Sequence, residues 1–288
     1  MRRWLTLCAH RLGLLLATII AAALLAGAFV RLAPGFGMDE RRMDLRLSAA
    51  SLEALEQRDS SLERTSGWFE PLFRLLRLDW GESATLRRPV RQLLAERAAR
   101  TLETLGSGLT LAWAFAAAAC VMLLSLRSKG LDRLATFIAG ILVCLPAAVV
   151  ALLFLQVDGG PRLVLATIML PRVFRYSRNI LDTGSRRAHV LAARARGVGS
   201  LGLLFRHIGL PALPELLALA GVSVSMACGA VIPVEAICDS PGVGQLMWQA
   251  AMGRDIVVLV DLTVVVAVLT CAANLLSDAG RALSKGAA

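Results

Sequence analysis

Two carboxylates in this sequence lie inside apolar stretches, where an ionisable side chain can carry chemistry. Glu235 stands near the end of the run Leu216–Ile237, and Asp261 stands six residues after Asp255 in the run Ile256–Leu276. A charged group in hydrocarbon costs several kcal/mol, so such a residue is a candidate proton or ion site. Both residues are also near the predicted outer ends of their runs, where water is within reach. Two interpretations therefore stay open, an intramembrane proton site and an interfacial carboxylate.

Motifs for other chemistry are missing from the sequence. It contains no G-x-x-x-x-G-K-[ST] loop for nucleotide phosphates, no H-E-x-x-H zinc motif and no G-x-S-x-G nucleophile turn. His189 and His207 lie far from acidic partners, and the six cysteines show neither a C-x-x-C pair nor a Cys/His metal spacing. We therefore predict no catalytic residue, no metal site and no cofactor in this chain, which would then not be an enzyme.

A polar segment, residues 189–214, separates two of the apolar runs. Its first half predicts a short helix with small residues at Ala192 and Ala193 and arginines at its end. Gly197 breaks this helix, because glycine accepts backbone angles that other residues avoid. Small side chains beside a glycine hinge favour a helix that docks into a groove of another protein. A helix lying on anionic lipid headgroups is the alternative.

The second half of this segment predicts another short helix. Ser200 is placed to cap it, and its apolar stripe would consist of Leu201, Leu204, Phe205 and Ile208. Pro211 and Pro214 are expected to end this helix and to begin the next span. The two helices together predict an amphipathic elbow with a basic rim.

The elements that must hold these residues are apolar helices. The 288 residues are 57% hydrophobic, above the share in soluble domains, and the net charge of +10 fits loop arginines better than nucleic-acid binding. Six runs are each expected to cross a membrane: Leu12–Val30, Leu105–Leu126, Leu134–Val157, Leu163–Phe174, Leu216–Ile237 and Ile256–Leu276.

The run Leu163–Phe174 is short for a span, and the placement of arginines decides its role. With six spans and an inside N-terminus, the eight arginines between Arg172 and Arg206 lie inside, and the short outside loops keep only Arg162 and Arg254. If this run did not cross, those eight arginines would lie outside, against the positive-inside rule. We therefore predict an all-α membrane protein with six transmembrane helices and both termini in the cytoplasm.

The chain divides into three predicted regions. Residues 1–31 form an N-terminal cytoplasmic segment and the first span, and residues 32–103 form a long extracytoplasmic loop with short amphipathic helices. One of these helices is expected to begin at Pro89. Residues 104–288 then form a core of five spans that contains the elbow.

The elbow resembles a known sequence element. "LAARARGVGSLGLLFRHIGLP" resembles the EAA loop of ABC-importer permeases through Ala192-Ala193, Gly197 and Ile208-x-Leu210-Pro211. In that family the loop forms the coupling helix that inserts into a cleft of the cytoplasmic ATPase. The sequence departs from the pattern at Leu191, where the family has the glutamate that names the loop.

The flanking segments narrow the resemblance. "RLAPG" at 31–35, "RRPVRQLLAERAARTLE" at 87–103 and "VEAICDSPGVGQLMWQAAMGRDIVVL" at 234–259 are similar to the first permease of dipeptide, oligopeptide and nickel importers. Two features depart from that subfamily. The turn at 158–162 replaces a longer outside loop, and the typical D-P-R ending is absent.

The resemblance implies a permease subunit of a binding-protein-dependent ABC importer in a bacterial inner membrane, with peptides or related small solutes as cargo. Its expected partners are a second homologous permease, two cytoplasmic ATPase subunits, an extracytoplasmic substrate-binding protein and the lipid bilayer, but not nucleic acid. The alternatives are a nickel or other small-solute importer of the same type and, from another class, a proton-coupled carrier that uses Glu235 and Asp261.

The resemblance also implies two groups of site residues. Coupling to the ATPase would involve Ala192, Ala193, Arg194, Arg196, Gly197, Ser200, Leu201 and Phe205. The extracytoplasmic loop and its partner contact would involve Glu235, Pro241, Gly242, Gly244, Arg254 and Asp255.

Overall fold

A computed structural model of the chain describes residues 80–286 except 127, 158, 200, 201 and 254, together with isolated helical positions between 13 and 28. Most of the predicted first span and residues 32–79 of the predicted loop lie outside the described residues. The described part is helical, as predicted, apart from turns and one isolated bridge between Glu82 and Pro89. The chain forms two compact units, residues 1–96 with 247–268 and residues 97–246 with 269–288.

Three continuous helices in the described residues are long and apolar enough to cross a membrane, namely Val90–Leu126, Leu203–Ile237 and Ile256–Leu275. The first is α4, and the third is the apolar part of α12 (Ile256–Gly286). The predicted amphipathic helix after Pro89 and the predicted second span are therefore one helix. No proline interrupts residues 90–126, so the predicted boundary between residues 103 and 104 falls inside α4.

The predicted third span, Leu134–Val157, is not one straight helix. It is divided into α5 (Lys129–Cys144) and α6 (Ala147–Leu155), which meet at an angle of 94°. Leu145 and Pro146 between them have extended backbone angles. A proline has no N–H to give to the helix before it, so the chain turns at this point.

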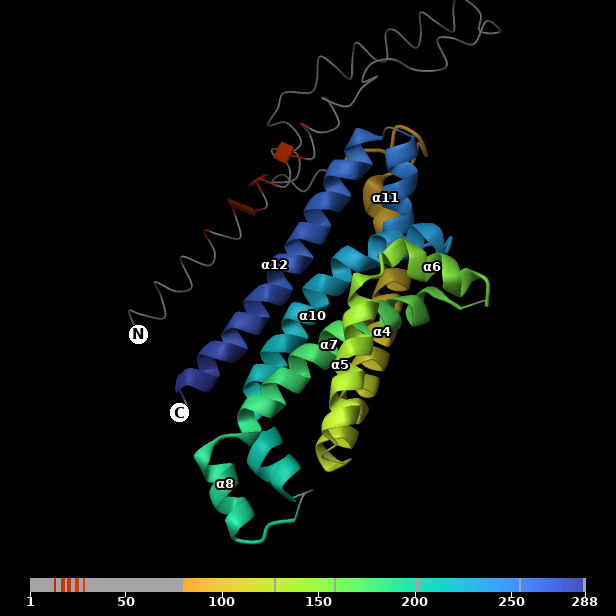
Figure 1. Cartoon of the computed structure of the whole chain (residues 1–288). Helices are drawn as coiled ribbons and strands as arrows, with labels where there is room; N and C mark the ends of the chain where they lie inside the picture. Colours follow the sequence, from red (N-terminus) through yellow and green to blue (C-terminus); the bar gives the residue numbers. More distant parts are fainter. Residues whose placement is uncertain are drawn as a thin grey trace, which may run out of the picture. The chain divides into compact units, whose positions relative to one another are not determined.

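The predicted fourth span lies within α7 (Pro161–Ser185), which is longer than the apolar run. This helix packs along α10 (Leu210–Ile237), its main neighbour in the second unit (Figure 1). Val164 and Ile168 share a buried cluster with Val234 of α10 and with α6. Near its other end, Leu181 shares a cluster with Ile208. The two helices are therefore antiparallel neighbours.

The prediction that Pro211 and Pro214 end the second elbow helix is wrong. The π-helix η2 (Leu203–Gly209) continues without a break into α10, and the two form the single helix Leu203–Ile237. Pro211 falls in the first turn of α10, where the wider π-helical turn ends and a missing N–H costs little. The proline pair therefore marks the change from π to α geometry within one continuous helix.

Candidate functional site

The elbow begins with a helix that ends where the sequence predicted. Helix α8 (Ala188–Ala195) stops at Gly197, whose φ of +81° lies in the left-handed region. The Gly197 N–H donates to the Arg194 carbonyl at 3.0 Å, and the Val198 N–H donates to the Ala193 carbonyl at 3.3 Å. These two bonds characterise a glycine C-cap, in which any side chain would be strained by roughly 1 kcal/mol or more. Gly197 therefore determines how the chain leaves α8.

One face of α8 packs on the protein and the other is exposed. Val190 and Ala193 are completely buried in a core cluster that includes Leu203 of η2. Leu191, Ala192, Arg194 and Arg196 are exposed, together with Ala195. Ala193 therefore holds α8 to its own chain, and the exposed side offers small and apolar surface bordered by two arginines.

The second elbow helix is described from Gly202 onward, so Ser200 and Leu201 lie outside the described residues. Leu204 and Ile208 are buried, as the predicted stripe requires, whereas Phe205 is 61% exposed. The Nε2–H of His189 donates to the His207 carbonyl at 3.0 Å, which ties α8 to η2. Phe205 is thus the large apolar side chain that η2 presents outward.

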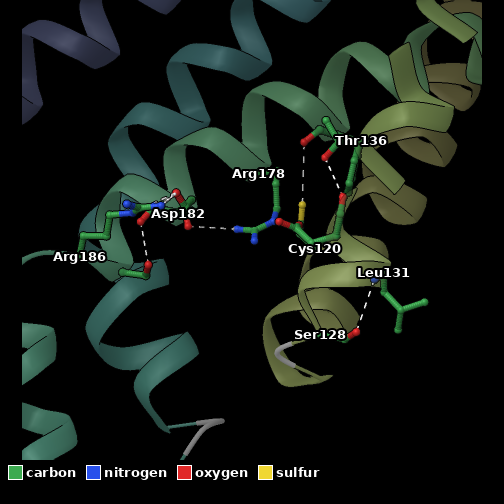
Figure 2. Close-up of polar contacts among 10 residues, drawn as sticks. Cys120, Ser128, Leu131, Thr136, Arg178, Asp182 and Arg186 are labelled. Carbon is green, nitrogen blue, oxygen red and sulfur yellow. Dashed lines mark hydrogen bonds and ion pairs between the residues drawn. The ribbon is translucent and has the colours of Figure 1, made fainter. Parts of the chain in front are cut away.

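A cluster of charged side chains lies near the elbow, on α7 and at the start of α5. Arg178, whose side chain is 17% exposed, donates to Asp132 of α5 at 2.8 Å and lies 3.8 Å from Asp182 on its own helix. Figure 2 shows Arg178 beside Asp182, which also accepts a 2.9 Å bond from Arg186. These contacts join α7 to the start of α5.

A pocket of about 370 Å³ adjoins this cluster. Its lining combines apolar residues of α4 and η2 with polar residues of α5, α7 and α8: Leu123, Leu124, Ser128, Asp132, Arg178, Asp182, Ser185, Arg194, Leu203, Leu204 and Ile208. The pocket therefore connects the elbow with the ends of three other helices.

Glu235, one of the two carboxylates singled out in the sequence, is fully buried and caps another helix. Its Oε2 accepts the Gly244 N–H at 2.8 Å and the Thr101 hydroxyl at 3.0 Å. Gly244 belongs to the first turn of α11 (Val243–Met252), whose N–H groups need acceptors from outside the helix. Glu235 is therefore buried within this chain, where its side chain caps α11.

The glycines around this carboxylate leave it the space it needs. A Cβ at Gly242 would collide with the Glu235 carboxylate. A Cβ at Gly244 would lie 2.7 Å from the Ile232 Cα and 3.1 Å from Glu235 Oε2. Both glycines face α10, the helix that carries Glu235. Packing therefore explains why glycines stand at residues 242 and 244.

Asp255 plays the same part in the other unit. It is 1% exposed, and its Oδ1 accepts the Val258 N–H at 3.3 Å, as expected of an N-cap for α12. Its Oδ2 accepts the Ser83 hydroxyl at 2.6 Å and the Thr85 N–H at 3.1 Å. Asp255 thus fixes the chain before α4 to the start of α12.

The remaining predicted outer residues differ in their burial. Pro241 is exposed and Gly242 is buried, while Arg254 lies outside the described residues. Sequence reasoning missed Thr101, because a lone threonine in a helix carries no signal for a contact with residues more than 130 positions away. It also missed Trp248, which is 53% exposed on α11 and detectable as a large aromatic in a predicted outer segment. The described residues contain no group of three His, Cys, Asp or Glu placed to hold a metal ion.

The similarity to known proteins covers both the elbow and the segment 234–259. Residues 105–284 match a family described as binding-protein-dependent transport system inner membrane component. Along most of its length the chain is similar to a peptide permease protein of Brucella suis, with 25% identity over 94% of this chain and 95% of the relative. It is also similar to the nickel import system permease protein NikB of Staphylococcus aureus, with 22% identity over 93% of this chain and 87% of the relative. A shorter stretch is 34% identical to the oligopeptide transport system permease protein AppB of Bacillus subtilis, over 41% of this chain and 37% of the relative.

Proposed function

The chain belongs to the binding-protein-dependent transport system inner membrane components, and we propose that within this family it is the permease of an importer for peptides or a related small solute. The observation that carries this proposal is the family match over residues 105–284, which includes both the elbow and the outer motif. As a permease of an ABC importer, the chain lies in the inner membrane and contributes to the translocation pathway.

The cargo class follows from the relatives. Two of them are named as peptide or oligopeptide permeases and one as a nickel permease. Peptides are our first choice, because the peptide permease covers the chain at the higher identity of the two full-length relatives. A nickel importer of the same type is the second. A proton-coupled carrier is not favoured, and Glu235, one of its two proposed proton sites, already serves as a helix cap.

The partners and the division of labour belong to the same proposal. A second homologous permease completes the pathway, two cytoplasmic ATPase subunits bind the elbows, and an extracytoplasmic binding protein delivers the cargo. The chain itself is non-catalytic, and the ATPase subunits hydrolyse ATP. Closure of the ATPases moves the elbows and switches the spans between inward-facing and outward-facing arrangements.

The exposed face of α8 supports the docking step. Leu191, which replaces the usual glutamate, is 53% exposed, and Ala192 and Ala195 beside it are small. A helix with small residues approaches a groove closely, and apolar side chains gain from losing contact with water. We expect this contact to depend on apolar packing, with Arg194 and Arg196 at its rim and Phe205 beside it.

Helix packing supports the part of the six-span proposal in which α7 crosses beside α10. The start of α7 shares a cluster with Val234 at one end of α10, and Leu181 of α7 shares a cluster with Ile208 at the other end. If α10 crosses the bilayer, α7 beside it runs across most of the same distance. The arginines of α7 and of the elbow then lie on the cytoplasmic side.

Substitution of Gly197 tests the proposal. Gly197→Asp places a side chain in a left-handed backbone and a charge on the docking helix, so it should abolish cargo-stimulated ATP hydrolysis in the purified importer while membrane insertion persists. Gly199→Asp is the matched control, because Gly199 also has open space around it but no positive φ. Unchanged stimulation in Gly197→Asp would argue against the coupling role of the elbow.

A further inference from the structure

The first turn of α11 is capped by side chains from two other helices. Glu235 of α10 accepts the Gly244 N–H at 2.8 Å, and the Thr101 hydroxyl oxygen of α4 accepts the Val243 N–H at 2.8 Å. Thr101 also donates to Glu235 at 3.0 Å, so the two caps are bonded to each other. All of these atoms are buried. The start of α11 is therefore fastened to α4 and α10 together.

A second set of hydrogen bonds holds the first turn of α11. Arg97 of α4 donates to Gln245 Oε1 at 2.6 Å, and Gln245 donates to Asp239. Asp239 has a φ of +48° directly after α10, and the next residue, Ser240, donates its N–H to the Glu235 carbonyl at 3.0 Å. The side chain and the main chain of Glu235 thus hold both ends of the connection from α10 to α11.

The capping arrangement differs from what stability alone requires. A serine or aspartate directly before α11 would satisfy the same N–H groups locally. Instead the position holds Gly242, which makes room for a carboxylate from another helix. The Oε1 of Glu235 makes no hydrogen bond within the described part of the chain, although it is buried. A cap built in this way holds the first turn of α11 to α10.

The other end of α10 reaches the elbow. The helix is continuous from Leu203 to Ile237, and at its Leu203 end the buried Val190 and Ala193 of α8 pack in one cluster with Leu203 and Ile208. At 1.5 Å per residue, this helix is about 50 Å long. One continuous helix therefore contacts α11 at one end and α8 at the other.

We propose that Glu235 and Thr101 are positioning residues that clamp α11 to α10, so that a force on α11 from the loaded binding protein moves α10 and, through it, α8. This inference rests on the proposed function, because it assumes a binding protein outside and an ATPase inside. Both side chains are buried within the chain. Their contribution is the coupling between the two faces of the subunit, and such couplings are physically carried by packed, rigid elements.

The test uses the importer purified from its own membranes with its co-purifying ATPase and second permease, reconstituted in lipid nanodiscs. ATP hydrolysis is measured with and without saturating loaded binding protein for Thr101→Val and Thr101→Ser. Valine keeps the shape of threonine but loses the hydroxyl, whereas serine keeps the hydroxyl. We expect the ratio of stimulated to basal hydrolysis to fall about tenfold in Thr101→Val, the size of a typical allosteric coupling, and to be retained in Thr101→Ser.

Glu235 provides a second pair of variants. Glu235→Gln keeps an acceptor for Gly244 and should retain most of the stimulation, whereas Glu235→Ala should lose it. Equal stimulation in wild type and Thr101→Val, or an equal loss in the serine and valine variants, would overturn the inference. Should the Glu235 variants not assemble, the threonine pair decides by itself. A wild-type complex that shows no stimulation at all would instead overturn the proposed function.

Discussion

At the scale of residues, two acidic side chains in the segment 234–259 act as helix caps. Glu235 caps the first turn of α11 and Asp255 caps the start of α12, and both are buried. The resemblance of the sequence implies that both residues belong to the extracytoplasmic loop and its partner contact. In the structure both carboxylates are buried, whereas Pro241 in the same segment is exposed.

Replacement of Asp255 should destabilise the unit that contains it. Asp255→Ala removes the cap of α12 and leaves the Ser83 hydroxyl and the Thr85 N–H without their acceptor, which should cost about 2 kcal/mol. Thermal unfolding of the purified protein in detergent measures the effect. Asp255→Asn keeps one carbonyl acceptor and should lose less, and equal stability of the alanine variant and wild type would contradict the capping role.

At the scale of elements, α5 and α7 share an apolar cluster and are also joined by an ion pair of Arg178. The Arg178 side chain is mostly buried between Asp132 and Asp182, each more than a third exposed, so solvent screens part of their attraction. Arg178→Ala leaves Asp132 without its cation, while Asp182 keeps Arg186, and should destabilise the protein by about 1–2 kcal/mol.

The control for Arg178 lies two turns along the same helix. Arg186 also bonds to Asp182, but its side chain is 78% exposed, so Arg186→Ala should change stability little. Unfolding midpoints of both variants in the same detergent provide the comparison. A loss in Arg186→Ala as large as that in Arg178→Ala would show that burial does not determine the value of these ion pairs.

The elements also show how far sequence reasoning reaches. The end of α8 at Gly197 was predictable, because a left-handed C-cap has a strong local preference for glycine. The bend at Pro146 and the continuity of η2 through Pro211 were not predictable. A proline separates two helices at the first position, whereas a proline is accommodated in the first turn of a helix at the second. The contact of Thr101 with Glu235 was also out of reach, because it depends on which helices become neighbours.

At the scale of the whole molecule, the number of spans depends on two elements together. The arginine argument shows that the elbow lies inside if α5–α6 crosses and α7 returns. It is equally satisfied if neither crosses, because two crossings cancel. The 94° bend between α5 and α6 is compatible with this second arrangement, in which the pair is re-entrant. The distribution of charge is therefore the same for six spans as for four.

The side of the membrane on which the turn between α6 and α7 lies distinguishes the six-span arrangement from the four-span one. Val157 is 73% exposed there, and α6 shares a buried cluster with Val234 near the outer end of α10, so six spans place Val157 outside. In a background without native cysteines, Val157→Cys should react with a membrane-impermeant maleimide on intact cells. Pro241→Cys should also react, whereas Gly199→Cys should react only after permeabilisation. Labelling of Val157→Cys that requires permeabilisation, while Pro241→Cys labels from outside, would replace the six-span arrangement with a re-entrant one. The elbow would remain inside in either case, so the coupling proposal does not depend on the result.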